Sequence, residues 1–332
     1  MFLIAVRSLS NTFQANSVTS SWNGLKAAAQ KGMQNITGAL CYRNSLLQAI
    51  FHQPKIVRWL VQTHKLESCT SDDEQKCLCC AVRGLVVAYW REGKVTYEAL
   101  NNIDAIFHHH GWRAGSRSGQ ADPDEQATWL FNAMRESLPT SVFSQFEAFM
   151  HVGTTSVTCC LKCKHESRKL GDEERCLSLP IAPRVRGGSV EDYLDRYLRE
   201  FVQDYTCEKC KDNKSQKERD IRIAHAPDVL TIQLKRFDWD GRKDSVHVTI
   251  NERLDLGDYR DTGNEQSMRY ELSAVIKHTG NAVSGHYISA AKGPDGQWCE
   301  YNDSFKKIRS LEDVVSGKNF TPYILYYQRM EA

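Results

Sequence analysis

The N-terminal part of the chain carries apolar residues at helical spacing. Between residues 44 and 60, apolar side chains recur every three or four positions, and Pro54 interrupts the run. Proline is tolerated in the first turn of a helix but not in its interior, so we expect one helix to end before Pro54 and another to start there. Similar spacing predicts helices over residues 77–91 and 124–138. The N-terminal third is therefore predicted to be mainly α-helical.

The hydrophobic period changes in the C-terminal third. In VLTIQLKRF, Leu230, Ile232 and Leu234 alternate with polar residues, which is typical of a β-strand. Further strands are predicted over residues 272–276, 286–291, 297–301 and 322–328. Before them, Ser189 and Asp192 have the spacing of a capping box, which predicts one short helix over residues 189–202. Helices followed by a mainly antiparallel sheet indicate an α+β fold.

Composition limits the classes of function. The 332 residues are 41% hydrophobic and 25% charged, enough for one large core or two modest ones. Because 43 basic residues are balanced by 41 acidic ones, no broad basic surface for nucleic acid is expected. The first apolar run, MFLIAV, ends at Arg7 and is too short to span a membrane. We expect a monomeric protein of the cytoplasm or nucleus that binds neither nucleic acid nor membrane.

Two pairs of cysteines have the spacing of metal ligands. Cys160 and Cys163 lie in CLKC, and Cys207 and Cys210 lie in CEKC. In a compartment that keeps thiols reduced, clustered cysteines indicate metal binding or catalysis rather than disulfides. Four thiolates suit a tetrahedral structural zinc ion, with no coordination position left for a reacting water. The alternative is that these are four small residues buried in strands.

Two other clusters are given structural interpretations. Cys77, Cys79 and Cys80 lie beside the apolar run 84–90, and we interpret them as part of a helix core. We identify no cysteine or carboxylate at metal-ligand spacing from the run His108–His110, and we interpret this run as a solvated loop.

A single cysteine lies between a turn and an apolar helix in ITGALCYRNSLLQAIF. At the start of that helix, Cys41 would lie at the positive end of the helix dipole, which favours a thiolate. A thiol nucleophile also needs a base, and His286 begins a predicted strand. The next strand ends at Asn302 and Asp303, either of which could orient the imidazole. Cys41 could equally be a small residue that closes the helix, and a histidine after a glycine is often structural.

Taken together, these motifs resemble the ubiquitin-specific proteases, a family of papain-like cysteine peptidases. The resemblance covers residues 24–329 and rests on several motifs in the same order. It implies a papain-like fold with a helical thumb, zinc-bearing β fingers and an antiparallel β palm. The motifs are GALCYRNSLLQ, the two cysteine pairs, PDVLTIQLKRF, YELSAVIKHTGNAVSGHYISA, WCEYNDS and PYILYYQR.

The resemblance also implies an organisation and an activity. Residues 1–23 are expected to be a loose arm, followed by one catalytic domain over residues 24–332. Within that domain we expect the thumb over about 24–150, the fingers over about 151–225 and the palm over about 226–330. The implied reaction is hydrolysis of the isopeptide or peptide bond after the C-terminal glycine of ubiquitin. Ubiquitin and ubiquitinated proteins are therefore the expected partners, and zinc is the expected cofactor.

Residue roles follow position by position from the same resemblance. Cys41 matches the nucleophile, His286 the general base and Asn302 the third member of the triad. Asp303 matches a neighbouring acidic residue that assists. The implied structural zinc ligands are Cys160, Cys163, Cys207 and Cys210.

The sequence departs from the family where the oxyanion donor is expected. The family has an asparagine five residues before the cysteine, but this chain has Ile36 there and Asn35 one residue earlier. A bulge at Thr37 and Gly38 would let the Asn35 amide remain a donor. Losing such a donor costs about 10²–10³ in rate in a well-studied protease. The box DEQATWLF departs too, with Trp129 after the Gln126–Ala127 pair.

These departures leave two alternatives to an active deubiquitinating hydrolase. One is a ubiquitin-binding module with weak or no turnover. The other is a protease for a different ubiquitin-like modifier, which composition and spacing do not distinguish from a ubiquitin protease.

Overall fold

The computed structural model describes residues 22, 32–63, 69, 77–92, 95–114, 119–181, 187–203, 205–214, 217–238, 240–281 and 284–331. The chain divides into two compact units, Met1–Phe149 with Ser273–Val314, and Met150–Leu272 with Val315–Ala332. The predicted N-terminal arm lies outside the described residues except for Trp22. The single catalytic domain over residues 24–332 stays a prediction.

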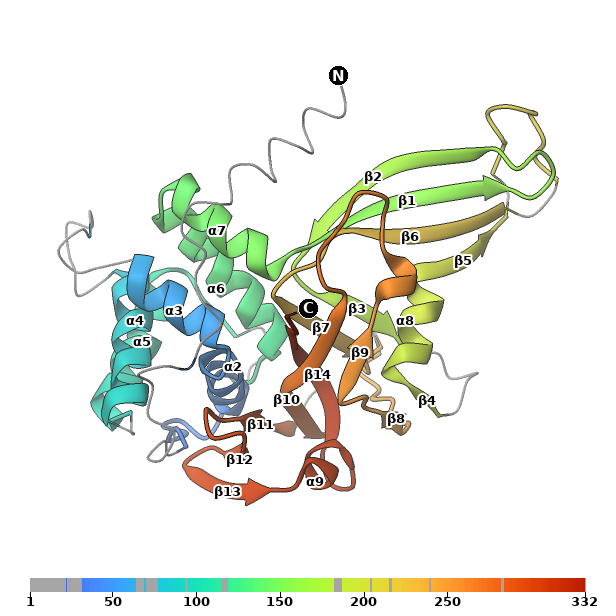
Figure 1. Ribbon diagram of the computed structural model, residues 1–332. Coiled ribbons are helices and arrows are strands. Elements are labelled where there is room, and N and C mark those ends of the chain that lie inside the picture. Colours follow the sequence, from blue (N-terminus) through green and yellow to red (C-terminus); the bar gives the residue numbers. More distant parts are fainter. Residues whose placement is uncertain are drawn as a thin grey trace. The chain divides into compact units, whose positions relative to one another are not determined.

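Helices form most of the first unit (Figure 1). The predicted break at Pro54 is confirmed, and so are the helices near 77–91 and 124–138. Helices α5 and α7 were not predicted, and neither was the short helix over residues 311–315. The helices of the first unit are α2 (Cys41–Phe51), α3 (Pro54–Thr63), α4 (Leu78–Val87), the π-helix η3 (Ala88–Glu92), α5 (Tyr97–His109), α6 (Pro123–Ser137) and α7 (Thr140–Met150).

The interpretation of the three histidines as a loop is wrong. His108 and His109 form the last turn of α5, and His110 is its C-cap. His108 lies one helical turn after Asp104, and its Nε2 is 3.7 Å from the Asp104 carboxylate.

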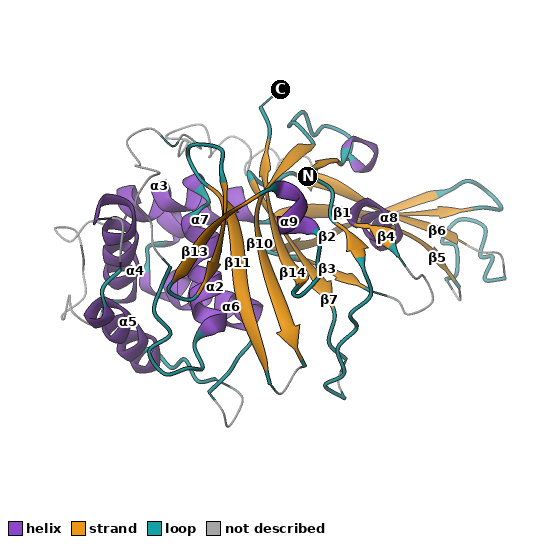
Figure 2. Cartoon of the chain, turned by 90° about the horizontal axis from the view of Figure 1, so that it is seen from below, coloured by secondary structure: helices purple, strands orange, loops and turns teal. Residues whose placement is uncertain are grey.

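Four antiparallel strands complete the first unit. They follow the order β13-β12-β11-β10, and α2 packs against β11 and β12 (Figure 2). Every residue of α2 is buried, including Arg43, Asn44 and Gln48. The strands are β10 (Arg269–Gly280, whose first four residues belong to the second unit), β11 (Gly285–Lys292), β12 (Trp298–Asn302) and β13 (Phe305–Arg309), followed by α9 (Leu311–Val315).

The second unit is mainly β. One antiparallel sheet has the order β2-β1-β6-β5, with strands β1 (Val152–Cys160), β2 (Glu166–Glu174), β5 (Arg199–Val202) and β6 (Lys217–His225). Strands β14 (Thr321–Arg329), β7 (Val229–Lys235) and β3 (Leu177–Pro180) are neighbours, with β3 parallel to β7. The remaining elements are β4 (Gly188–Ser189), α8 (Val190–Leu198), β8 (Val248–Thr249), β9 (Arg253–Asp255) and the 3-10 helix η4 (Gly257–Tyr259).

Local signals between residues 189 and 328 were mostly predicted correctly. Ser189 and Asp192 form both bonds of the capping box at the start of α8. The helix predicted over residues 189–202 is too long, however, because α8 ends at Leu198 and residues 199–202 form strand β5. The strands predicted over residues 272–276, 286–291, 297–301 and 322–328 correspond to β10, β11, β12 and β14. The α+β class is confirmed. Of the helices in the described ranges, none combines the length and the apolar composition that a bilayer crossing requires.

Candidate active site and cysteine cluster

Cys41 is the first residue of α2. Its side chain is 2% exposed, which suits a core residue and a shielded nucleophile equally. The thiol forms a hydrogen bond with His286, however, and a thiol that only filled space would need no such partner. The N–H groups of the first helical turn have no acceptor within the helix, so they favour negative charge at this end.

His286 is positioned by the pairing of β11 with both neighbouring strands. The hairpin of β11 and β12 turns at Gly293 and Gly296, and Ser289 lies opposite Tyr301. This register brings the end of β12 beside the start of β11. The Nε2 atom of His286 lies 2.7 Å from Oδ1 of Asn302. Because an amide oxygen only accepts hydrogen bonds, Nε2 carries the hydrogen and Nδ1 is left for the Cys41 thiol.

The His286 imidazole is electrostatically tuned by these neighbours. The hydrogen bond with Cys41 is the largest cause that raises the pKa of His286, and Asn302 adds to it. Burial acts in the opposite direction, and the resulting pKa is about 9. His286 therefore carries a proton at neutral pH.

Asp303 fastens the segment before Cys41 to the turn after β12. Its Oδ2 accepts a hydrogen bond from Asn35 Nδ2 at 3.1 Å, and its Oδ1 accepts one from Asn44 Nδ2 at 2.8 Å. Asn44 lies on α2, so this single carboxylate contacts both sides of Cys41 in the sequence. Its backbone has a φ of 48°, in the left-handed region that aspartate tolerates better than most residues.

A close backbone approach supports the same junction. A Cβ placed on Gly32 would lie 1.9 Å from the Asp303 carbonyl oxygen, so no other residue fits there without a shift of the backbone. Sequence reasoning did not identify Gly32 or Asn44. A glycine and a buried asparagine that flank a candidate nucleophile were the available signals.

The displaced Asn35 lies at the candidate site. Its Oδ1 accepts a hydrogen bond from the Leu40 N–H at 3.0 Å, and its Nδ2 donates to Asp303. These bonds span the turn that contains Thr37 and Gly38, and Gly38 has a φ of 81°. The amide has two N–H groups, and the bond to Asp303 uses one of them.

A buried polar network lies along the remainder of α2. His52 Nδ1 lies 2.7 Å from the Gln48 carbonyl, and Nε2 accepts from the hydroxyl of Tyr301, the residue before Asn302, at 3.2 Å. Burial lowers the pKa of His52 to about 4, so this imidazole is neutral. Tyr89 donates to Gln48 Oε1 at 2.7 Å. None of these residues was predicted to support the site.

Gln126 on α6 is a further polar group with a special environment. Its side chain is 1% exposed, and within the described part of the chain neither its amide nitrogen nor its amide oxygen has a hydrogen-bond partner. A buried amide without hydrogen bonds lowers the stability of the folded protein by about 1–3 kcal/mol, so its presence needs an explanation. It belongs to the box DEQATWLF.

In the second unit, the two predicted cysteine pairs meet at one end of a sheet. The sulfur atoms of all four cysteines lie within 4.8 Å of one another. Cys160 ends β1 directly opposite Lys217, which begins β6, and the CEKC pair precedes β6 in the chain. Strand pairing therefore brings CLKC and CEKC together.

The sulfur separations fit a tetrahedral metal ion. Cys160 Sγ lies 3.8 Å from Cys210 Sγ, and Cys163 Sγ lies 3.6 Å from Cys207 Sγ. Zn–S bonds of about 2.3 Å at tetrahedral angles place sulfur atoms about 3.8 Å apart. The donor set is thus of the right chemistry and size for zinc.

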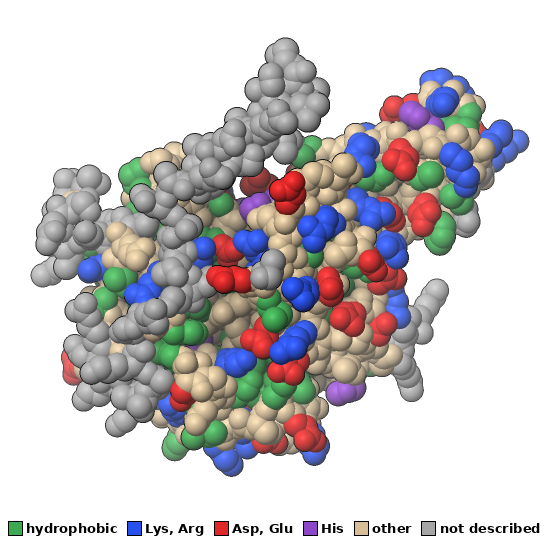
Figure 3. Space-filling view, in the orientation of Figure 1, with side chains coloured by type: hydrophobic (Ala, Val, Ile, Leu, Met, Phe, Trp, Pro, Cys, Tyr) green, Lys and Arg blue, Asp and Glu red, His purple; other side chains and the backbone are tan. Residues whose placement is uncertain are grey.

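The two turns have the same local geometry. The N–H of Cys160 donates to the His165 carbonyl at 2.9 Å, and the N–H of Cys207 donates to the Asp212 carbonyl at 2.9 Å. The fourth residue after each first cysteine, Lys164 or Lys211, has a φ of 57°. On the face shown in Figure 3, basic side chains lie at this end of the sheet together with acidic and histidine side chains.

Backbone N–H groups of both turns stabilise thiolates. Hydrogen bonds from the N–H groups of Cys210 and Lys209 are the main causes that lower the pKa of Cys207, to about 6. The N–H groups of Cys163 and Lys162 act in the same way on the pKa of Cys160. Each turn therefore favours the ionised form of its first cysteine, which is the form that metal binding requires. Although the Asp212 N–H lowers it, burial and the neighbouring thiols raise the pKa of Cys210 to about 11.

Comparisons with known proteins agree with this arrangement. Residues 31–327 match the family model described as ubiquitin carboxyl-terminal hydrolase. Ubiquitin carboxyl-terminal hydrolase 25 of Arabidopsis thaliana is 29% identical over 326 residues, which cover 90% of this chain and 47% of that protein. Human ubiquitin carboxyl-terminal hydrolase 42 is 27% identical over 316 residues, which cover 90% of this chain and 23% of that protein. The chain thus spans less than half the length of these relatives.

Solved structures share the fold. A chain of the SAGA Ubp8/Sgf11/Sus1/Sgf73 DUB module bound to ubiquitin aldehyde matches with a TM-score of 0.77 and 22% identity, over 100% of this chain and 76% of that one. A chain of the same module bound to monoubiquitin matches with a TM-score of 0.76 and 22% identity, over 99% and 75%. The predicted fold and the resemblance to the ubiquitin-specific proteases are confirmed.

Proposed function

Because the chain belongs to the ubiquitin carboxyl-terminal hydrolase family, we propose that it is a thiol hydrolase that cleaves the bond after the C-terminal glycine of ubiquitin. The observation that supports this most directly is the series of hydrogen bonds from Cys41 to His286 and from His286 to Asn302. This order of groups provides a nucleophile, a proton carrier and a residue that orients the carrier.

The proposed reaction has two stages. In the first, the Cys41 sulfur attacks the glycine carbonyl as a thiolate, and His286 holds the proton that the thiol has given up. The tetrahedral intermediate then breaks its C–N bond, and His286 Nδ1 transfers its proton to the departing amine. The product is a thioester between Cys41 and ubiquitin.

In the second stage, water replaces the amine. His286 Nδ1 takes one proton from the water while the oxygen attacks the thioester carbonyl. The C–S bond breaks, ubiquitin leaves with a free carboxyl group, and the thiolate and the protonated imidazole are restored. Asn302 keeps the hydrogen of the imidazole on Nε2 throughout, so that Nδ1 always faces the sulfur.

Two groups are proposed to stabilise the oxyanion. One is the backbone N–H of Cys41 in the first helical turn, and the other is the second N–H of the Asn35 amide. Asp303 acts as a positioning residue, because its carboxylate restrains Asn35 and α2 together. The unpartnered Gln126 amide provides a donor and an acceptor of the kind that an extended peptide tail requires.

We also propose that Cys160, Cys163, Cys207 and Cys210 hold one structural zinc ion. The bound ion would fix the two turns to each other, and its four thiolates leave no position for substrate. Lys217 and Asp212 form an ion pair of 3.0 Å beside the cluster, and Lys162 lies 3.4 Å from the same carboxylate. These lysines offset part of the negative charge of a four-thiolate site.

The proposed setting is the cytoplasm or nucleus, where thiols stay reduced, because the nucleophile and the metal ligands both require reduced cysteine. Ubiquitin and ubiquitinated proteins are the proposed partners of a monomer, whose catalytic domain is proposed to extend over residues 24–332.

A ubiquitin probe with a C-terminal electrophile tests the proposal. The wild-type protein should form a covalent adduct, and Cys41→Ala should form none while it keeps its fold by circular dichroism. Cys176→Ala, a half-buried cysteine between β2 and β3, is the matched control and should react normally. An adduct with Cys41→Ala would disprove the assignment of the nucleophile.

The same assay distinguishes the alternatives. A wild-type protein that binds ubiquitin without forming an adduct would be a binding module. Preferential reaction with a probe built on another ubiquitin-like modifier would change the proposed substrate.

A further inference from the structure

A third group of thiols converges in the first unit. The sulfur atoms of Cys69, Cys77 and Cys80 all lie within 4.8 Å of one another. Cys77 is buried, whereas Cys69 and Cys80 are half-buried. A disulfide joins only two cysteines, and thiols are weak hydrogen-bonding groups, so neither interaction explains why three should meet.

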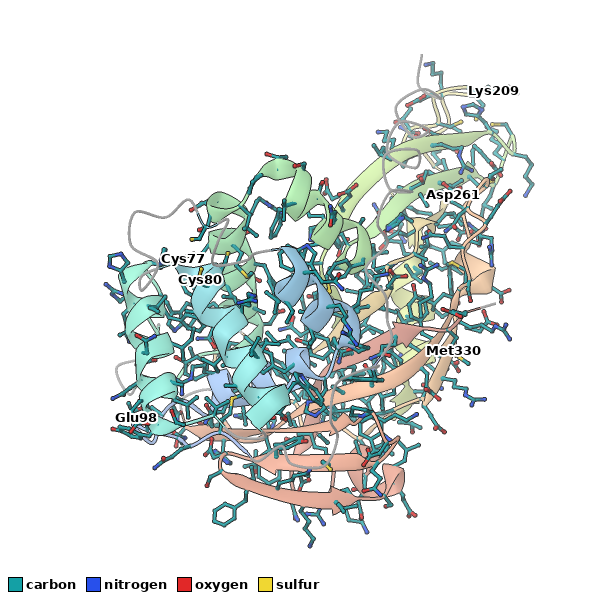
Figure 4. All side chains as sticks on the ribbon, turned by 60° about the vertical axis from the view of Figure 1, so that its left-hand side comes forward. Cys77, Cys80, Glu98, Lys209, Asp261 and Met330 are labelled. Carbon is teal, nitrogen blue, oxygen red and sulfur yellow. The ribbon has the colours of Figure 1, made fainter. Side chains whose placement is uncertain are left out.

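The start of α4 brings these residues together. Cys77 is the N-cap residue, and Cys80 lies in the first turn of the helix, three positions later (Figure 4). Residues at the N-cap and three positions after it face each other, as they do in a capping box. Cys69 comes from the connection between α3 and α4. The free N–H groups of the first turn of a helix also favour anionic groups at this end.

We propose that Cys69, Cys77 and Cys80 bind a second zinc ion. The pair Cys77 and Cys80 has the same CxxC spacing as the two pairs of the four-cysteine cluster. Soft thiolate ligands select zinc among the divalent ions available to a protein. Three thiolates occupy three of the four tetrahedral positions, and the fourth is open to water or another donor.

The interpretation of this group as helix core is confirmed for Cys79 and for the buried Cys77, whereas Cys80 on α4 is half-buried. Cys79 is 1% exposed, and it does not belong to the set of three converging sulfur atoms. Periodicity placed all three neighbouring cysteines on the helix, but it could not show that Cys69 lies close to two of them.

The proposed ion has a structural consequence for the catalytic unit. A metal would tie Cys69, which precedes α4 in the chain, to the start of that helix. The helix continues into η3, where Trp90 donates to the Phe51 carbonyl at 3.0 Å and Tyr89 donates to Gln48. Both acceptors belong to α2, so the second zinc ion stabilises the helices that support Cys41.

Metal analysis of the full chain tests this inference. Purified protein dialysed against zinc-free buffer should contain two zinc ions per chain. The single variants Cys69→Ser, Cys80→Ser and Cys160→Ser should each contain one zinc ion. The double variant Cys69→Ser/Cys160→Ser should contain none. Cys79→Ser is the matched control from the same helical turn and should keep two.

The result that would overturn the proposal is one zinc ion in the wild type, lost in Cys160→Ser, or an unchanged content in Cys69→Ser. If a variant misfolds, the wild type gives an independent measurement through alkylation mapped by mass spectrometry. Cys69 and Cys80 should react at least tenfold faster after chelation of zinc, and equal rates would refute the site. Zinc content does not depend on ubiquitin cleavage, so this test stands apart from the proposed activity.

Discussion

The candidate catalytic centre and the four-cysteine cluster both depend on cysteine, but the chain builds them differently. The cluster consists of two copies of one local turn, each complete within a few residues. The catalytic centre joins the start of α2 to the ends of two strands, and Asp303 links it to Asn35 across 268 positions of sequence. Two local turns, brought together by the pairing of β1 with β6, therefore define the candidate metal site, whereas strand pairing and a few long-range hydrogen bonds define the candidate nucleophile with its base.

The two regions also place thiolates in different surroundings. In the cluster, backbone N–H groups and neighbouring lysines face the sulfur atoms. In the catalytic centre, one thiol has a titratable partner, His286, which can give and take a proton. The first arrangement fixes charge for a metal, and the second allows charge to move during a reaction.

The largest expected effect is the loss of a cluster ligand. Cys160→Ser or Cys210→Ser should release the zinc ion from this cluster, because one of its two turns is then left with a single thiolate. We expect a loss of about 3 kcal/mol or more in stability, which lowers Tm by roughly 4 °C or more if the 332 residues unfold together. Cys159→Ser, the neighbour of Cys160, serves as the control. Retained zinc in both ligand variants would contradict the proposed metal site.

A smaller effect is expected when the orienting amide of the catalytic centre is removed. Asn302→Ala should reduce kcat/KM on ubiquitin with a fluorescent leaving group by about 100-fold, since His286 loses its fixed orientation. Zinc content should stay the same. An unaltered kcat/KM would show that another residue orients the imidazole.

The pH dependence of the same variant sharpens the comparison. The pKa of His286 is raised to about 9, so its proton is present below that pH and is lost as the pH rises through it. The basic limb of the kcat/KM profile should therefore fall near pH 9 in the wild type. Asn302 helps to raise this pKa, so the limb should move to lower pH in Asn302→Ala. A limb at the same pH in both proteins would assign it to a different group.

A third prediction concerns the displaced amide. Asn35→Ala removes a donor that is needed more in the transition state than in the ground state, so kcat should fall about tenfold while KM changes only a few-fold. Thr37→Ala, a change in the same turn, is the control. A change below twofold in both parameters would show that Asn35 only stabilises the turn.

The smallest effect is expected at the turns of the cluster. Lys211 has a left-handed backbone that glycine adopts without strain, but glycine also makes the unfolded chain more flexible. Lys211→Gly should therefore stabilise the protein by less than about 1 kcal/mol, as measured by denaturant unfolding. A lower free energy of unfolding in Lys211→Gly would show that the lysine side chain stabilises the protein by more than the relief of backbone strain does.

Local patterns predicted much of the fold. The capping box at Ser189, the break at Pro54 and the alternation in VLTIQLKRF each depend on a few adjacent residues. Helix α5 was missed although its buried apolar residues follow the helical period, because asparagines and histidines, which are weak helix formers, fill much of the segment. Strand β2 was missed because its charged sequence, ESRKLGDEE, has no apolar alternation and remains mostly exposed.

The candidate site was predictable only in part. The pairing of His286 with Asn302 followed from two adjacent strands joined by a short turn. The contacts of Asp303 with Asn44, and of Tyr301 with His52, join segments about 250 residues apart. No periodicity within one segment specifies such a contact, because it depends on how a helix packs against a sheet.

The complete burial of α2 has a consequence for how the sequence can vary. An ordinary surface helix has an exposed stripe where substitutions are nearly silent, so its tolerance to mutation follows the helical period. In α2, by contrast, every position from Cys41 to Phe51 is buried, and its polar residues are held by buried partners. A saturation mutagenesis scan of positions 41 to 51 should therefore find no helical period in the tolerance to substitution. Substitutions elsewhere in the first unit should be tolerated far more readily than substitutions in this helix.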